Sequence, residues 1–257
     1  MTLERCSLAE LAIEDEASFR HVGSYADLKR VVTNMGSCFL APHEGSIAWD
    51  RALLLNLIAW EPGLADVLAS RDLPADVIPH VGFHQLTDRF VKPSVEAHLL
   101  GESIASAYDI YLVGRLLGHS ADAAFLESQV PRMAEVAAAA GLDDAAFERL
   151  LEDIAGAPEA AFRDLRELLF DASVALLPTM PPEEAAAVLS RFDSRRMAPL
   201  LHHFELTTWV LRGRIEQAKP DPSWDGGEHA KQIDLELRKE TDPLAWIDRH
   251  WLHPSLA

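Results

Sequence analysis

Cysteine and positive charge are scarce in this sequence. Only two cysteines, Cys6 and Cys38, occur in 257 residues, too few for a disulfide framework or a four-thiolate zinc site. Lysine and arginine together number 23 against 41 aspartates and glutamates, which gives a formal net charge of −18. Because such a surface repels polyphosphate, we expect neither nucleic acid nor an anionic membrane as a partner.

Long hydrophobic runs are also absent. No uncharged apolar stretch approaches the ~20 residues that a membrane span needs, and acidic residues interrupt the opening MTLERCSLAELAIEDEASF, which argues against a signal peptide. We therefore expect a cytoplasmic protein. Hydrophobic residues make up 49% of the chain, which is enough for a sizeable core.

Apolar residues recur mainly at helical spacing, with almost no strand-like alternation and no internal repeat. The sequence thus predicts an all-α fold in a single domain, 1–257. Helices are expected over 50–68, after Pro74, after Pro93 and over 194–217, with three or four more between Pro131 and Phe192, broken near 156–158 and at PTMPPEE. Residues 218–243 are polar and begin with prolines and glycines, which predicts a long loop or a mobile cover.

Histidines occur in three local patterns that could bind a metal or a cofactor. His80 and His84 are four residues apart on one helical face, and His98 and Glu102 repeat that spacing. His202 and His203 lie in LLHHFELTTWVL, which is apolar on nearly every side. Burying such polar groups is costly unless each has a partner, so they are either core residues with partners or ligands of a metal or cofactor.

Two kinds of metal chemistry remain open at this point. A two-metal oxygenase could use His80, His84, His98, Glu102, His203 and Glu205, although none of these histidines has the Glu three residues earlier that such sites usually show. A haem site needs only two well-separated histidines on two helices. The third alternative is a non-catalytic helical protein whose acidic face binds a basic partner.

The segment DVIPHVGFHQLTDRFVK, residues 76–92, resembles the signature helix of the tryptophan 2,3-dioxygenase superfamily. In that helix an acid precedes an apolar turn and His-Gln, and an acid, an aromatic residue and a lysine follow at fixed spacing. The matching residues are Asp76, His84, Gln85, Asp88, Phe90 and Lys92. Upstream, GSYADLKRVV is similar to the family's Tyr-containing helix, with Tyr25 and Leu28 in place. The similarity covers roughly residues 20–130, with a weaker match near 195–215.

This resemblance implies an all-α enzyme that holds haem b over an aromatic amino acid. His84 corresponds to the family's distal histidine. SRRMAPLLHH is similar to the approach to the proximal ligand, which makes His202 or His203 the axial candidate, with a slight preference for His203. His80 would bind a propionate or orient His84. Among the flanking arginines Arg195, Arg196, Arg212 and Arg214, we expect Arg196 and Arg212 to hold propionates or a substrate carboxylate.

The departures from the family narrow the expected reaction. The Ser-rich segment with the carboxylate-binding arginine is missing, and RGRIEQAKPDPSWDGG replaces the Gly/Thr-rich covering loop. The resemblance is therefore closer to the haem-dependent tyrosine hydroxylases of natural-product pathways, which convert a phenol to a catechol with peroxide or dioxygen. L-tyrosine is the expected substrate, and a homodimer is left open.

Overall fold

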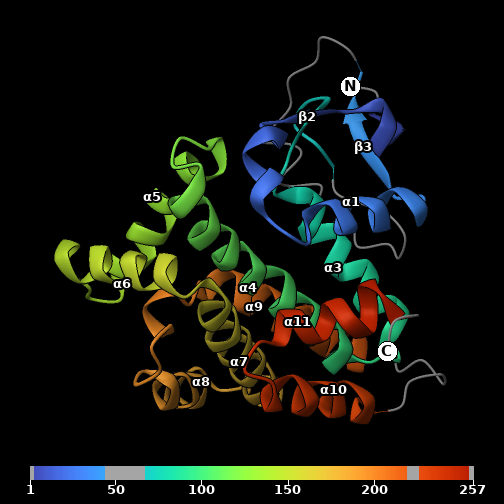
Figure 1. The fold of residues 1–257 in the computed structure, drawn as a ribbon. Coiled ribbons are helices and arrows are strands. Elements are labelled where there is room, and N and C mark those ends of the chain that lie inside the picture. The colour runs from blue at the N-terminus through green and yellow to red at the C-terminus, as the bar shows by residue number, and fades with distance from the viewer. Residues whose placement is uncertain (1–2, 44–66, 219–225, 255–257) are drawn as a thin grey trace. The chain divides into compact units, whose positions relative to one another are not determined.

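The computed structural model describes residues 3–43, 67–218 and 226–254, and most of these residues are helical (Figure 1). The predicted predominance of helix is confirmed, whereas the likeness to the tryptophan 2,3-dioxygenase fold stays a prediction. Contacts divide the chain into two compact units, Met1–Gln85 and Leu86–Ala257. The single domain expected from the sequence also stays a prediction. Among the described residues, no helix is both long and apolar enough to cross a membrane.

The described residues of the first unit form four short strands. Strand β1 (Leu3–Ser7) pairs antiparallel with β3 (Cys38–Pro42), and β2 (Ala12–Glu14) pairs parallel with β4 (Asp72–Pro74). Helix α1 (Tyr25–Asn34) and two 3₁₀ turns, Leu8–Glu10 and Glu16–His21, complete its described elements before α3. These strands differ from the sequence-based expectation, because three to five residues are too few to show a reliable period-two pattern.

Helix α3 (Val77–Phe90) carries His80 and His84, but it begins later than expected. Pro74 ends strand β4 instead of starting the helix. Pro79 falls in the first turn of α3, where its missing N–H removes no helical hydrogen bond. Gly82 allows a close approach to α1, since an added Cβ would lie 3.2 Å from the Leu28 side chain.

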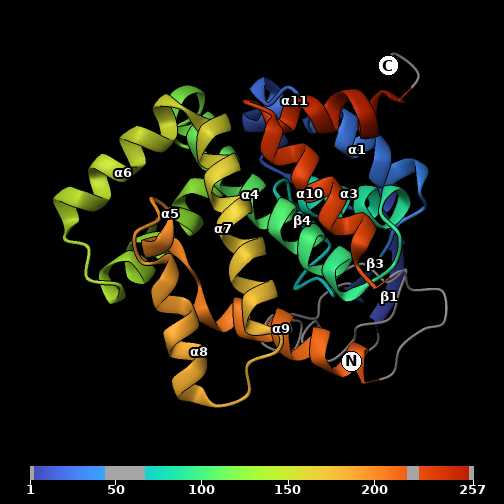
Figure 2. The same cartoon turned by 90° about the horizontal axis from the view of Figure 1, so that it is seen from below.

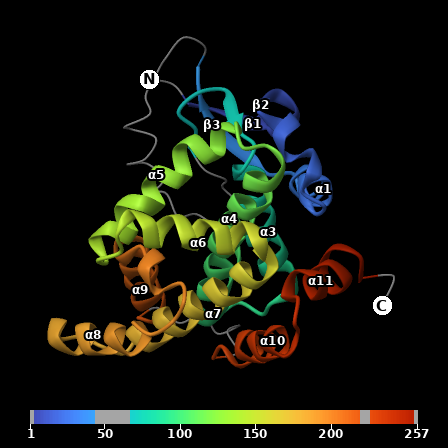
Figure 3. The ribbon, with the colours of Figure 1, turned by 60° about the vertical axis from the view of Figure 1, so that its left-hand side comes forward.

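The second unit is helical throughout its described residues. It comprises α4 (Val95–His119), α5 (Ala124–Ala139), α6 (Asp144–Gly156), α7 (Pro158–Leu176), α8 (Pro182–Leu189), α9 (His203–Gln217), α10 (Glu228–Lys239) and α11 (Pro243–Ile247). Short helical turns span Ser190–Phe192, Ala198–Leu200 and Asp248–Leu252. Helix α4 is central: α7 packs along it, and α5, α6, α9 and α10 also contact it (Figures 2 and 3).

Helix α4 forms as the sequence predicts. Ser94 caps its first turn, accepting a hydrogen bond from the Ala97 backbone N–H at 2.9 Å. The apolar stripe expected along it is buried: Val95, Leu99, Ile104, Tyr108, Tyr111, Leu112 and Leu116. Gly114 marks its closest approach to a neighbour, because an added Cβ would lie 2.6 Å from the Ile154 carbonyl oxygen of α6.

The remaining predicted helix bounds agree with the structure in some places and differ in others. The helix expected over 50–68 lies almost wholly outside the described residues. The predicted breaks are confirmed, since α6 ends at Gly156, α7 begins at Pro158 and α8 begins at Pro182. Helix α9 begins nine residues later than the predicted 194. Helix α10 occupies 228–239, within the stretch expected as a loop or mobile cover, because its apolar positions Ala230, Ile233 and Leu237 are buried.

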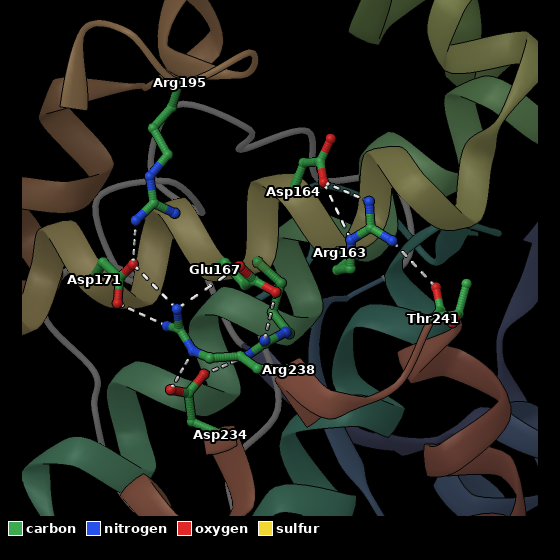
Figure 4. Close-up of polar contacts among 9 residues, drawn as sticks. Arg163, Asp164, Glu167, Asp171, Arg195, Asp234, Arg238 and Thr241 are labelled. Atoms are coloured by element: carbon green, nitrogen blue, oxygen red, sulfur yellow. Dashed lines mark hydrogen bonds and ion pairs between the residues drawn. The ribbon is translucent and has the colours of Figure 1, made fainter. Parts of the chain in front are cut away.

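A network of charged side chains attaches α10 to α7 (Figure 4). Asp234 of α10 accepts hydrogen bonds from Arg166 at 2.6 Å and from Arg238 at 2.7 Å. Arg238 also donates to Asp171 of α7 at 2.7 Å, and Arg195 reaches the same carboxylate at 2.6 Å. The Arg166 side chain is fully buried. Without the Asp234 carboxylate its charge would be left unpaired, so the network stabilises the packing of α10 on α7 only while Asp234 is present.

Candidate functional site

His80 and His84 are brought together by the first half of α3. Their Nε2 atoms are 3.3 Å apart, and their ring centroids are 5.0 Å apart with the planes tilted by 58°. Both side chains are partly buried. Residues four apart on a helix lie one above the other, which explains this contact, and the role of His80 in orienting His84 stays a prediction.

Gln85, the residue after His84, makes a side-chain hydrogen bond within the first unit. Its amide nitrogen donates to the Ser37 hydroxyl, just before strand β3, while its Oε1 atom is buried without a hydrogen-bond partner. Ser37 is a contact that sequence reasoning missed, because it lies 48 residues earlier in the chain. The contact fixes the helical turn that carries His84 to the first unit.

Phe90, Lys92 and Asp88 of the matching segment contact or interact with residues of the second unit. Phe90 stacks on Trp251, with ring centroids 5.8 Å apart and planes 4° apart. The backbone N–H of Lys92 donates to Nδ1 of His229 at 3.0 Å. Burial raises the pKa of the Asp88 carboxyl, and the positive charge of Arg212 acts in the opposite direction. Upstream, Tyr25 and Leu28 are buried in the first unit.

His202 and His203 play different parts at the start of α9. Nδ1 of His202 accepts a hydrogen bond from the backbone N–H of Glu205 at 3.3 Å, so this imidazole caps the helix. A nitrogen that accepts must keep its lone pair, and the proton of the neutral ring then lies on Nε2. Metal ligation through either nitrogen would break the cap or require the other tautomer. The cap therefore favours His203 over His202 as a metal ligand.

Helix α9 is apolar on two opposite sides. Leu206, Trp209 and Val210 are buried against the second unit. The other side carries an exposed row, called the α9 stripe below: Phe204 at 65% exposure, Leu211 at 50% and Ile215 at 64%. These three residues follow one another at seven- and four-residue steps, so they share one face. His203 is also exposed, but it lies about 100° around the helix from Phe204 and is therefore not part of the α9 stripe.

The four flanking arginines, including the expected anion ligands Arg196 and Arg212, already have partners within the protein. Arg195 pairs with Asp171, Arg196 donates to Asp164 at 3.1 Å and Arg212 donates to Glu216 at 2.9 Å. Arg214 instead caps α7, donating to the carbonyl oxygens of Leu176 at 2.8 Å, Leu177 at 3.0 Å and Thr179. A guanidinium there satisfies carbonyls that the helix end leaves unpaired. The assignment of Arg196 and Arg212 to propionates stays a prediction.

His98 and Glu102 lie side by side on α4, with Nε2 of His98 3.5 Å from a carboxylate oxygen of Glu102. Burial, together with the nearby charge of Arg212, lowers the pKa of His98 to about 3. Among the described residues, no group of three or more potential ligand atoms includes His98, His203 or Glu205. The six-ligand two-metal arrangement is therefore not assembled around these three residues.

Two hollows open on the second unit. One, of about 490 Å³, is lined mainly by α6 together with Arg196 and Pro199. The other, of about 370 Å³, is lined by Lys92 and by residues of α10, including His229 and Lys231. Neither hollow is lined by His84 or His203. The two hollows therefore do not contribute to the candidate haem site.

Comparisons with protein-family models, with curated proteins and with solved structures found no match to this chain. No family assignment follows from them. Functional inference therefore depends on the residues of the His-Gln segment and on the geometry of α3 and α9.

Proposed function

We propose that this protein is a haem-dependent oxygenase that hydroxylates the ring of an aromatic amino acid, with L-tyrosine converted to its catechol. The observation that carries the proposal is the exposed imidazole of His203 at the start of α9, a helix that also exposes the apolar α9 stripe. A histidine-ligated haem needs an accessible imidazole for the iron and apolar protein surface for the ring. The His-Gln segment supplies the second histidine.

The residues present fit a histidine-ligated haem in two respects. His203 is exposed and is not the residue that caps its helix, so its ring can offer a lone pair to iron. Phe204, Leu211 and Ile215 are each at least half exposed, and covering these apolar side chains with a flat apolar ring would be favourable. Bound haem would supply the activation of peroxide or dioxygen.

The proposed role of His84 is to accept the proton of the substrate phenol. An imidazole can accept a proton near neutral pH, and a positioned base of this kind typically contributes ~10²–10⁴-fold to the rate. His80 lies 3.3 Å away and can receive a hydrogen bond from the protonated ring. With peroxide as oxidant the balance closes: a ring C–H becomes C–OH, the O–O bond breaks, and water leaves.

A haem titration tests this proposal. Purified protein titrated with haem should develop a Soret band at one equivalent per chain. His203→Ala should lose or shift that band, and His202→Ala should retain it with a less stable helix. His84→Ala should bind haem and lose turnover of tyrosine to the catechol. Failure of wild-type protein to take up haem would refute the proposal.

The two alternatives predict different compositions of the purified protein. A two-metal oxygenase would contain about two iron or manganese ions per chain and no Soret band. A helical binding protein would contain neither, and His84→Ala would leave its stability unchanged. Metal analysis beside the absorption spectrum therefore distinguishes all three.

A further inference from the structure

His80 and His84 have a geometry suited to a metal ion as well as to a hydrogen bond. The observed separation of the Nε2 atoms is 3.3 Å. Two ligands at about 2.0–2.1 Å from Zn²⁺, with a tetrahedral angle between them, are about 3.3–3.4 Å apart. A right angle at the metal would bring the nitrogens to about 2.9 Å.

The scaffold that holds the pair is firm. Both histidines belong to one helix and are separated by a single turn, the arrangement in which two imidazoles can bind one zinc ion. Ile78 and Phe83 anchor this turn in the first unit, each at 1% exposure or less. Gly82 lets the same turn pack closely against Leu28, which also helps to fix the backbone that carries the two rings.

We propose that His80 and His84 form a chelating site for Zn²⁺, with tetrahedral coordination completed by water or by an exchangeable ligand. Both rings are partly exposed, so an ion can reach the site from solvent. The site goes beyond the haem function, and it has a consequence for it. An imidazole that donates its Nε2 lone pair to zinc cannot also accept a phenol proton there, so zinc inhibits hydroxylation through His84.

Calorimetric titration of the haem-free protein with zinc chloride tests the site. We expect one Zn²⁺ per chain, lost in His80→Ala and in His84→Ala and retained in His119→Ala, whose imidazole is exposed at the end of α4. His80→Gln and His84→Gln keep the polarity of the positions, so they serve if the alanine variants do not fold. Cobalt(II) in place of zinc should give the intense visible bands of a tetrahedral ion.

Zinc binding that survives both single substitutions would overturn the proposal, as would weak, octahedral-type cobalt bands. Because the titration uses protein without haem, its result is independent of the Soret test. Absent zinc binding removes this site and leaves the haem proposal standing. Zinc binding without haem uptake would remove the haem proposal and leave the zinc site standing.

Discussion

Asp234→Ala should be among the most destabilising single substitutions in the second unit. Asp234 is 8% exposed and accepts hydrogen bonds from the fully buried Arg166 and from Arg238 (Figure 4). Two other nitrogens of Arg166, Nε and one Nη, are buried without a hydrogen-bond partner, so Asp234 is its main source of compensation. Burial lowers the pKa of Arg166, and the Asp234 charge acts against this effect.

The expected loss follows from the cost of an unpaired buried charge. Removing one partner of a buried ion pair costs about 3–5 kcal/mol. With a urea slope of about 2 kcal/mol/M, the midpoint of unfolding would fall by about 1.5–2.5 M. Far-ultraviolet circular dichroism during urea denaturation measures this shift, because the described residues of the second unit are largely helical.

A matched control comes from the same helix as Arg166. Asp164 pairs with Arg163 and Arg196, each at 3.1 Å, but its side chain is 28% exposed. Asp164→Ala should therefore cost about 1 kcal/mol or less. The double change Arg166→Met with Asp234→Leu should recover most of the loss, since an apolar pair of similar volume needs no compensation. Equal effects of the two alanine substitutions would refute the reasoning.

Three further outcomes follow from the second unit. Gly114→Ala should cost about 1–3 kcal/mol, because its Cβ would meet the Ile154 carbonyl oxygen at 2.6 Å; thermal unfolding measures this, and an unchanged midpoint would show that α4 and α6 can separate freely. Ser94→Ala should cost about 0.5–2 kcal/mol by removing the cap of α4, whereas Ser94→Asp should not. His98 has a pKa of about 3, below the 6.5 of the unfolded chain, so the folded protein keeps it neutral. Its contribution to the free energy of unfolding is complete above pH 6.5 and falls by about 1.4 kcal/mol per pH unit between pH 6.5 and 3. His98→Gln should remove that slope, and a wild-type stability that rises on acidification would mean that the Glu102 carboxylate keeps the ring protonated.

Local signals were sufficient for much of the fold. Pro93 and Ser94 mark the start of α4, and Gly156 with Pro158 separates α6 from α7, because these residues act through their own backbone and caps. The pairing of β1 with β3 depends on contacts about 35 residues apart, and no local pattern specifies it. The helix over 228–239 was hidden by its polar composition, although Ala230, Ile233 and Leu237 have helical spacing.

The candidate site could be predicted in its residues more than in its geometry. The four-residue spacing of His80 and His84 predicts their contact, and the structure contains it. The capping role of His202 was not predictable, since it depends on where α9 begins. A signal for the buried network did exist: Arg166 falls on the apolar face of α7, four residues after Phe162, and both are fully buried.

Ligand replacement at position 203 tests the central claim most directly. His203→Gly removes the proposed axial imidazole and leaves space at the start of α9, so free imidazole added to the haem-treated variant can occupy it. We expect the Soret band to be lost in the variant and restored, together with tyrosine hydroxylation, by imidazole. A haem spectrum in His203→Gly identical to that of the wild type before imidazole is added would contradict the account.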